Sequence, residues 1–311
     1  MKTPLRIITA AILLMVFSVA GAQEINNIAE RLGYPADAKL LIVHADDIGL
    51  AHSVNSATIE AFEKKGISSG SIMVPCPWFN EFTKYAREHP GLDVGIHLTL
   101  TAEWEHYKWD GVMPSGEIPS LLDEEGYFYA SVEEVAMHAD PEEVEKEVRA
   151  QIDRAIDFGI VPTHIDTHMG SVAATPELTG IYLKLGKEYG LPILLPRTWL
   201  QSVPAEQREE LEKDYVLTDQ IFMMHEDSPE MTWGESYSRM VSQVRPGLNV
   251  MIVHLAYDNE EMQAVAINHP DFGSAWRQRD LDFVTSGEFK DLLKKHNIHL
   301  VTWKEIKDTW Y

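Results

Sequence analysis

Strand-like and helix-like segments alternate along this chain from Leu40 to Thr302. The expected strands are short apolar runs, and the expected helices have apolar residues at helical spacing with proline or glycine near their ends. Such alternation predicts parallel strands joined by right-handed crossovers. We therefore predict a single α/β domain, a distorted (β/α) TIM-like barrel of about seven parallel strands rather than an open sheet.

The boundaries follow from the apolar runs and the helix stop signals. Strands are expected within residues 40–50, 69–75, 92–100, 162–168, 192–195, 249–255 and 298–302. Helices are expected at residues 54–65, 78–89, 141–158, 176–189 and 286–296. The stretches 102–132 and 197–243 are less regular and rich in Trp, Tyr and Pro, so we expect long loops there.

The first expected strand ends in two adjacent carboxylates, Asp46 and Asp47, followed closely by Gly49. Active sites of parallel α/β folds lie at the carboxyl ends of the strands. Neighbouring side chains on an extended chain point to opposite faces, so the two aspartates are expected to take separate tasks such as metal ligation and proton transfer. The structural alternative is a turn after a buried strand, where Asp and Gly are common.

Three later strands carry histidines near their ends: His97, then His164 and His168, and finally His254. A single histidine of this kind is more often structural than functional. Four strand-end sites along one chain favour a shared function. Carboxylates and imidazoles from different strands can converge on one divalent cation, and open coordination positions would make such a site catalytic.

The amino terminus has the pattern of a cleaved export signal. Lys2 and Arg6 precede an uncharged stretch at 7–19, and the small residues 20–22 follow it. This predicts a signal peptide at 1–22 and one domain at 23–311. The uncharged stretch is shorter than the roughly 20 residues of a spanning helix, so we expect no membrane span and a periplasmic or secreted protein.

The composition is strongly acidic, with a formal net charge of -23. An acidic surface repels nucleic acid and anionic lipid, so no nucleic-acid partner is expected and a neutral or cationic substrate is favoured. The single cysteine, Cys76, lies in an apolar run and is expected to be buried and structural. The sequence does not decide between a monomer and a homodimer.

The aromatic residues Trp104, Tyr107 and Trp109 lie in the first irregular stretch. Long loops at the carboxyl ends of barrel strands build substrate clefts, and aromatic rings can stack on sugar rings. The same residues could equally cover the barrel mouth as packing. The sequence leaves both interpretations open.

Three blocks together resemble the YdjC-like carbohydrate deacetylases of the ChbG and HpnK type. They are Ala45-Asp46-Asp47-Ile48-Gly49-Leu50 with Asn55, then residues 95–101 (Gly-Ile-His-Leu-Thr-Leu-Thr), then residues 162–168 (Pro-Thr-His-Ile-Asp-Thr-His). The resemblance spans about residues 39–303. It implies a distorted β/α barrel, one divalent metal ion (Mg or Zn), and hydrolysis of an N-acetyl group on an amino sugar.

Roles can be carried over position by position from this resemblance. It implies Asp47, His97 and His168 as metal ligands, Asp46 as general base, and His254 as an acid near the leaving group. The candidate substrate-binding residues are His44, Trp104, Asp166 and Arg197. An amide is a poor electrophile, so the reaction needs a cation to polarise the carbonyl, a base to take a proton from water, and an acid to protonate the amine.

The chain departs from the usual pattern of the family at three points. Residues 169–172 (Met-Gly-Ser-Val) stand where relatives have further histidines, His44 stands in place of an Asn, and Leu255 in place of a Pro. Two other functions remain open: a secreted glycan-binding protein without catalytic activity, and an iron oxygenase, because two histidines and one carboxylate also form the Fe(II) facial triad.

Overall fold

The computed structural model describes residues 27–225 and 231–311. The predicted signal peptide at 1–22 lies outside the described residues. None of the helices in the described part of the chain is long and apolar enough to span a bilayer.

A curled sheet of seven parallel strands forms the centre of the molecule, in the order β4-β3-β2-β1-β6-β5, with β7 paired to the beginning of β1. The strands are β1 Lys39–Ile48, β2 Ser69–Ile72, β3 Val94–Leu98, β4 Ile165–Thr167, β5 Gln220–Phe222, β6 Gly247–His254 and β7 Ile298–Leu300. Single parallel bridges from Ile193 to β4 and from Pro196 to Thr218 link the two edges of the sheet. The predicted α/β TIM-like fold is confirmed, and its distortion lies at this thin connection.

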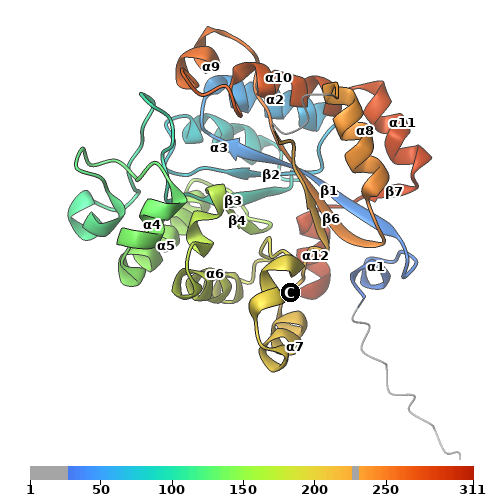
Figure 1. The fold of residues 1–311 in the computed structure, drawn as a ribbon, viewed down its shortest axis with the longest axis horizontal. Coiled ribbons are helices and arrows are strands. Elements are labelled where there is room, and N and C mark those ends of the chain that lie inside the picture. Colours follow the sequence, from blue (N-terminus) through green and yellow to red (C-terminus); the bar gives the residue numbers. More distant parts are fainter. Residues whose placement is uncertain (1–26, 226–230) are drawn as a thin grey trace, which may run out of the picture.

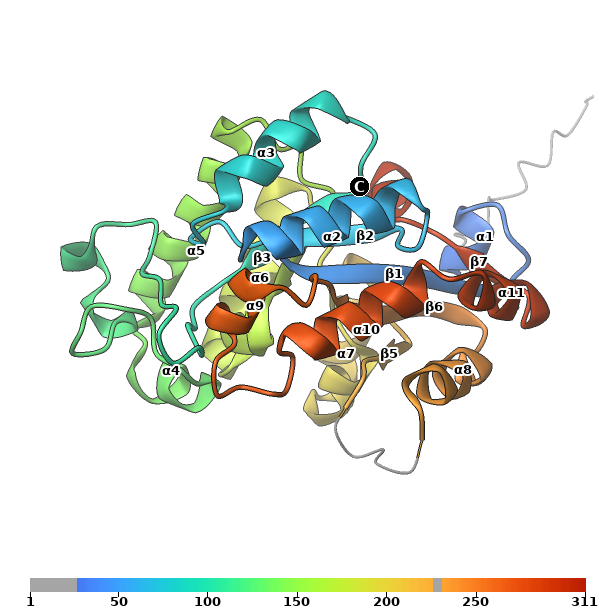
Figure 2. The same cartoon turned by 90° about the horizontal axis from the view of Figure 1, so that it is seen from above.

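Helices surround the sheet, with α2, α10 and α11 along one side and α5 and α6 along another (Figures 1 and 2). They are α1 Ile28–Arg31, α2 His52–Glu63, α3 Phe79–Glu88, α4 Val132–His138, α5 Pro141–Asp157, α6 Pro176–Tyr189, α7 Ala205–Asp214, α8 Trp233–Gln243, α9 Glu260–Val265, α10 Ser274–Val284, α11 Gly287–Lys295 and α12 Trp303–Trp310. Local signals explain several of them. Pro141 and Pro176 begin α5 and α6, and Gly190 ends α6 in the left-handed conformation.

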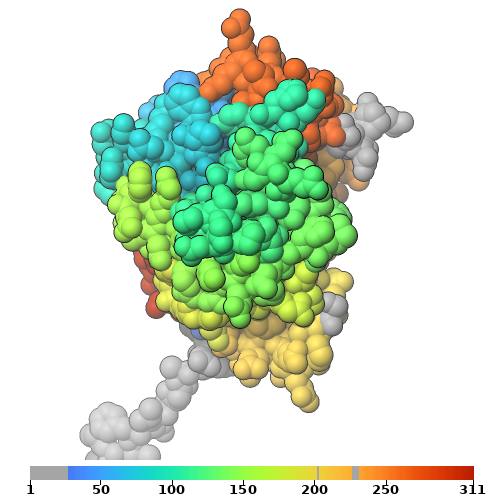
Figure 3. Space-filling view, turned by 90° about the vertical axis from the view of Figure 1, so that its left-hand side faces the viewer, coloured from blue at the N-terminus to red at the C-terminus, as the bar shows by residue number. Residues whose placement is uncertain are grey.

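Two predicted features differ from the structure. The stretch 197–243 contains α7, β5 and α8 rather than one long loop. The predicted strand at 192–195 forms only isolated bridges. By contrast, 102–131 is irregular as predicted, with two short 3₁₀ turns, Ser115–Glu117 and Pro119–Leu121, and one bridge between Leu122 and Phe128, and α4 begins at Val132. Figure 3 shows this segment, in green shades, covering much of the face toward which β1 points in Figure 1.

Candidate active site

The strands bring the polar residues together because every second side chain of a strand points to the same face. His44 and Asp46 are two residues apart on β1, and Asp166 and His168 are two residues apart at the end of β4. The pairing register of the strands brings in two further residues: His254 of β6 lies opposite Asp46, and His97 of β3 lies opposite Asp166. The predicted strand-end residues therefore share one end of the curled sheet.

Asp47 reaches the same place by a different route. Its φ of 65° is left-handed, and the register of β1 with β2 shifts between Ala45 and Ile48. The chain is thus not extended at Asp47, and the expectation that the two aspartates face opposite ways is wrong. Both line the same pocket. A left-handed non-glycine residue is uncommon and is often found at functional sites.

Asp47, His97 and His168 form a compact buried cluster. Asp47 Oδ1 lies 3.5 Å from His97 Nε2 and 3.2 Å from His168 Nδ1, and the two imidazole nitrogens are 3.3 Å apart. Three ligands of one tetrahedral ion at 2.0–2.1 Å would be about 3.3–3.4 Å apart, so the triangle has the size of a coordination face. Asp47 Oδ1 is buried and has no hydrogen-bond partner, which also fits a metal ligand. This group could bind a divalent metal ion.

A carboxylate lies behind each of these two histidines. Asp166 Oδ1 is 2.8 Å from His97 Nδ1, and Glu103 Oε2 is 3.0 Å from His168 Nε2. If each carboxylate accepts an N–H, the opposite ring nitrogen presents its lone pair to the cluster. Such carboxylate–histidine pairs orient metal ligands and make them more basic. Asp166, a candidate for substrate binding, thus contacts a proposed metal ligand, although it also borders the pocket.

Helix α10 contributes two further groups. Arg277, which is 1% exposed, donates from Nη2 to Asp47 Oδ2 at 2.7 Å, leaving Oδ1 to face the histidines. Burial would raise the pKa of Asp47, but the Arg277 charge and contacts with the two histidines hold it well below its ordinary value. One turn later, Asp280 accepts a hydrogen bond from the backbone N–H of His254 at 3.1 Å. The helix thereby fixes both Asp47 and the end of β6.

Asp46 and His254 lie beside this cluster. Asp46 Oδ2 is 3.9 Å from His97 Nε2 and 4.0 Å from His254 Nε2. Burial is the main reason that the pKa of His254 falls to about 4, with the Arg277 charge acting in the same direction. His254 Nδ1 has no hydrogen-bond partner, and Phe272 packs edge-on against its ring. The imidazole is therefore neutral around pH 7 and close to the proposed base.

A pocket of about 630 Å³ opens above these groups. Its floor contains Asp46, Asp47, His97, Asp166, His168 and His254, with Glu103 and Arg277 beside them. Trp104 borders the pocket although it is only 1% exposed. The outer wall is mainly apolar and includes Met169, Trp199, Ile221 and Met223. The pocket therefore has a charged floor, and this apolar outer wall forms its rim.

The structure places the other candidate residues away from this opening. His44 is fully buried behind the floor. Arg197 lies outside the pocket and pairs on the surface with Glu212 and Asp219. Trp109 is buried and the Tyr107 hydroxyl donates to the Leu50 carbonyl, so both serve packing. Cys76 is buried, as predicted, and burial raises the pKa of its thiol.

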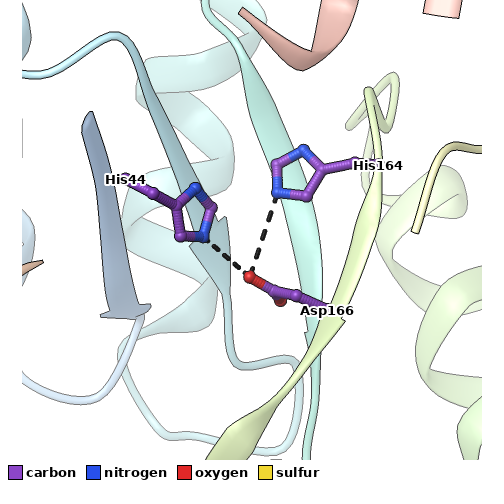
Figure 4. A group of neighbouring side chains, drawn as sticks. All are labelled: His44, His164 and Asp166. Atoms are coloured by element: carbon purple, nitrogen blue, oxygen red, sulfur yellow. Dashed lines mark hydrogen bonds and ion pairs between the residues drawn. The ribbon is translucent and has the colours of Figure 1, made fainter. Parts of the chain in front are cut away.

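A second group, His44, His164 and Asp166, is compact enough to be considered as a metal site. Figure 4 shows the His44 imidazole, from β1, and the His164 imidazole, from the residue just before β4, approaching the Asp166 carboxylate. His44 Nε2 is only 2.7 Å from Asp166 Oδ2, a hydrogen-bond distance, whereas His164 Nε2 is 3.9 Å away. These distances fit a shared proton better than a common ion.

Sequence reasoning missed Glu103, Arg277 and Asp280. Glu103 follows β3 by a few residues in a stretch without regular structure. Arg277 and Asp280 lie in α10, for which no helix was expected. Both are 1% exposed, but burial is not visible in the sequence, where an Arg and an Asp three residues apart look like ordinary surface charges.

Comparison with known proteins gives a consistent result. Residues 40–295 match the family model described as YdjC-like protein. A carbohydrate deacetylase of Brevibacillus brevis is 35% identical over 271 residues, covering 86% of this chain and 99% of the relative. One of Thermus thermophilus is 33% identical over 299 residues, covering 92% and 100%. A solved structure from Enterococcus faecalis V583, provisionally assigned to cellobiose-phosphate cleavage, has a TM-score of 0.72 at 27% identity and covers 86% of this chain and 99% of its own.

Proposed function

Because the chain belongs to the YdjC-like family, we propose that it is a metal-dependent carbohydrate deacetylase that hydrolyses the N-acetyl group of an amino sugar. The observation that carries this proposal is the Asp47, His97 and His168 triangle at the bottom of a pocket, with Asp46 and His254 beside it. A divalent ion bound there would polarise the acetyl carbonyl and make a water molecule more acidic.

Asp46 is the proposed general base. It lies at the pocket floor, and its Oδ2 faces the region between His97 and His254. It would take a proton from the water that attacks the carbonyl carbon. Its neighbour Asp47 already uses Oδ2 to accept a hydrogen bond from Arg277, so the two aspartates have different environments despite being adjacent.

His254 is the proposed acid toward the leaving amine. It is neutral at rest because its pKa is about 4, so it must gain a proton before it can give one away. Asp46 Oδ2, 4.0 Å from His254 Nε2, would hold the proton taken from water. Transfer of this proton from Asp46 through His254 to the amide nitrogen would let the C–N bond break and give acetic acid and the free amine. The acid proton would then pass to the amine, so the products are acetate and an ammonium group.

The wall of the pocket supports a carbohydrate substrate. Trp199 borders the opening and is 37% exposed, and exposed aromatic faces stack on sugar rings. The acidic surface would also favour a product carrying a new ammonium group. We also propose export of the protein by the segment at 1–22, on the basis of its charge and small-residue pattern.

The test is acetate release from N-acetylglucosamine oligosaccharides by the purified protein. Activity should disappear after chelation and return on addition of Zn(II), Co(II) or Mg(II), and the same series would identify the preferred metal. Glycan binding without acetate release by the metal-loaded protein would instead support the binding-protein alternative. Oxygen consumption that requires Fe(II) would support the oxygenase alternative.

A further inference from the structure

We infer that His44 is a positioning residue that ties the proposed base Asp46 to Asp166, the carboxylate behind the metal ligand His97. The inference rests on the proposed function. His44 is fully buried and does not border the pocket, so it cannot contact the substrate. It lies on the same face of β1 as Asp46, two residues earlier.

The His44 ring contacts both carboxylates through one nitrogen. Nε2 lies 2.7 Å from Asp166 Oδ2 and 3.0 Å from Asp46 Oδ1. Asp46 Oδ1 is buried and receives no well-aligned hydrogen bond, so the His44 charge is its close electrostatic partner. The ring thus fixes Oδ1 and leaves Oδ2 directed toward His254 and His97.

The hydrogen-bond pattern requires a proton on each ring nitrogen of His44. The Ser69 hydroxyl donates to Asp93 Oδ1 at 2.6 Å, so toward His44 Nδ1, 3.1 Å away, it can only accept. The Ser71 hydroxyl donates to Asp166 Oδ2 at 2.9 Å. Nε2 faces two carboxylates, which are acceptors only. His44 is therefore an imidazolium.

The charges around the ring agree with this assignment. Burial opposes a charge on His44, but the hydrogen bonds and charges of Asp166 and Asp46 outweigh it and raise its pKa to about 9. The other titratable groups nearby are Asp93, beyond Ser69, His97, beyond Ser71, and His164, whose ring lies 5.0 Å from that of His44. Burial and the neighbouring His44 charge hold the pKa of His164 well below its ordinary value.

The connection continues from Asp166 to the proposed metal site. Asp166 Oδ1 accepts from His97 Nδ1, and its Oδ2 accepts from His44. Oxygens of Asp46 and Asp166 lie within 4.8 Å of each other and of a His97 nitrogen, and His44 Nε2 contacts both carboxylates. One buried charge therefore sets the positions of both the base and the carboxylate that orients His97.

The experiment compares His44→Leu, His44→Gln and the unsubstituted metal-loaded protein. We expect His44→Leu to lower kcat by roughly 10- to 100-fold, as is usual for residues that orient metal ligands, with KM changed by less than about 2-fold and one metal ion retained. His44→Gln keeps a donor without the charge and should recover part of kcat. In the Co(II) form, His44→Leu should alter the visible absorption bands because His97 is no longer fixed.

The matched control is Asn249→Leu, because Asn249 is equally buried in the same sheet but donates to the backbone carbonyls of Leu40, Arg245 and Gly247 near the amino ends of β1 and β6. It should lower thermal stability while leaving kcat and the Co(II) spectrum unchanged. The inference is overturned if His44→Leu keeps full kcat, or if both His44 variants lose activity only in proportion to lost metal or lost folded protein. Should His44→Leu not fold, His44→Gln decides by the same criteria. Absence of acetate release by the unsubstituted protein would instead reject the proposed function.

Discussion

The floor and the rim of the pocket are built on different principles. The floor lies on β1, β3, β4 and β6, where its charged groups are buried and in mutual contact. The rim lies on connecting segments and short elements, where Met169, Trp199 and Ile221 are 49%, 37% and 36% exposed. Reactive groups must be placed to within fractions of an ångström, which strands achieve, whereas contacts with the remainder of a substrate tolerate loops. The difference assigns chemistry to the floor and substrate selection to the rim.

The largest effect is expected for Asp47→Ala. It removes the carboxylate of the ligand triangle, so the metal should be lost and acetate release should fall by roughly 10³-fold or more, since a metal ion contributes several kcal/mol to such a reaction. Metal content by mass spectrometry under native conditions checks this. A variant that retains a tightly bound ion would remove Asp47 from the ligand set.

Asp46→Asn should separate chemistry from metal binding within the floor. We expect one metal ion per chain as before and a loss of turnover on the order of 10²-fold or more, the usual contribution of a general base. Comparison of metal content with Asp47→Ala is the internal control. Equal loss of metal in both variants would show that the two aspartates do not divide the tasks as proposed.

His254→Ala should have a smaller effect, roughly 10- to 100-fold on kcat, because solvent can partly replace an acid toward a departing amine. Metal content and melting temperature should change little, since the ring has no hydrogen bond from Nδ1 and the backbone contact with Asp280 remains. Full activity of this variant on N-acetylated amino sugars across roughly pH 6 to 9 would remove His254 from the mechanism.

At the rim, Trp199→Ala should raise KM about 3- to 10-fold with kcat unchanged, which corresponds to the loss of one aromatic stacking contact. Trp78→Ala is the matched control, because Trp78 is also 37% exposed but does not border the pocket. Steady-state kinetics on one oligosaccharide gives both parameters. A fall in kcat without a change in KM would mean that the rim takes part in the chemistry.

The smallest effect concerns the pH dependence of stability. A histidine whose pKa is raised in the folded protein stabilises it fully below its unfolded value of 6.5, and this contribution is lost as pH rises through the folded value of about 9. The melting-temperature difference between the unsubstituted protein and His44→Gln should therefore shrink from pH 6 to pH 9.5. The corresponding difference for Trp199→Ala should not change with pH.

Most of the fold could be predicted from local pattern. The apolar runs gave β1, β2, β3, β4, β6 and β7 to within a few residues, and proline and glycine marked the ends of α5 and α6. β5 was missed because three residues at the edge of a sheet carry too little periodicity. α10 was missed because it buries Trp276, Arg277, Asp280 and Leu281, so its polar and apolar residues do not separate into two clear faces.

The sequence by itself placed the reactive residues at strand ends, because a strand has a period of two and parallel strands end together. The sequence could not determine how deeply each of these side chains is buried. His44 was predicted to meet the substrate, yet the tertiary structure places it wholly beneath the pocket floor. Asp166 borders the pocket, and its contact with His97 was not visible in the sequence. Nor could it determine the backbone at Asp47, whose left-handed φ brings adjacent carboxylates to one site. Arg277, 230 residues away in sequence, meets Asp47 only because tertiary packing brings α10 against the end of β1.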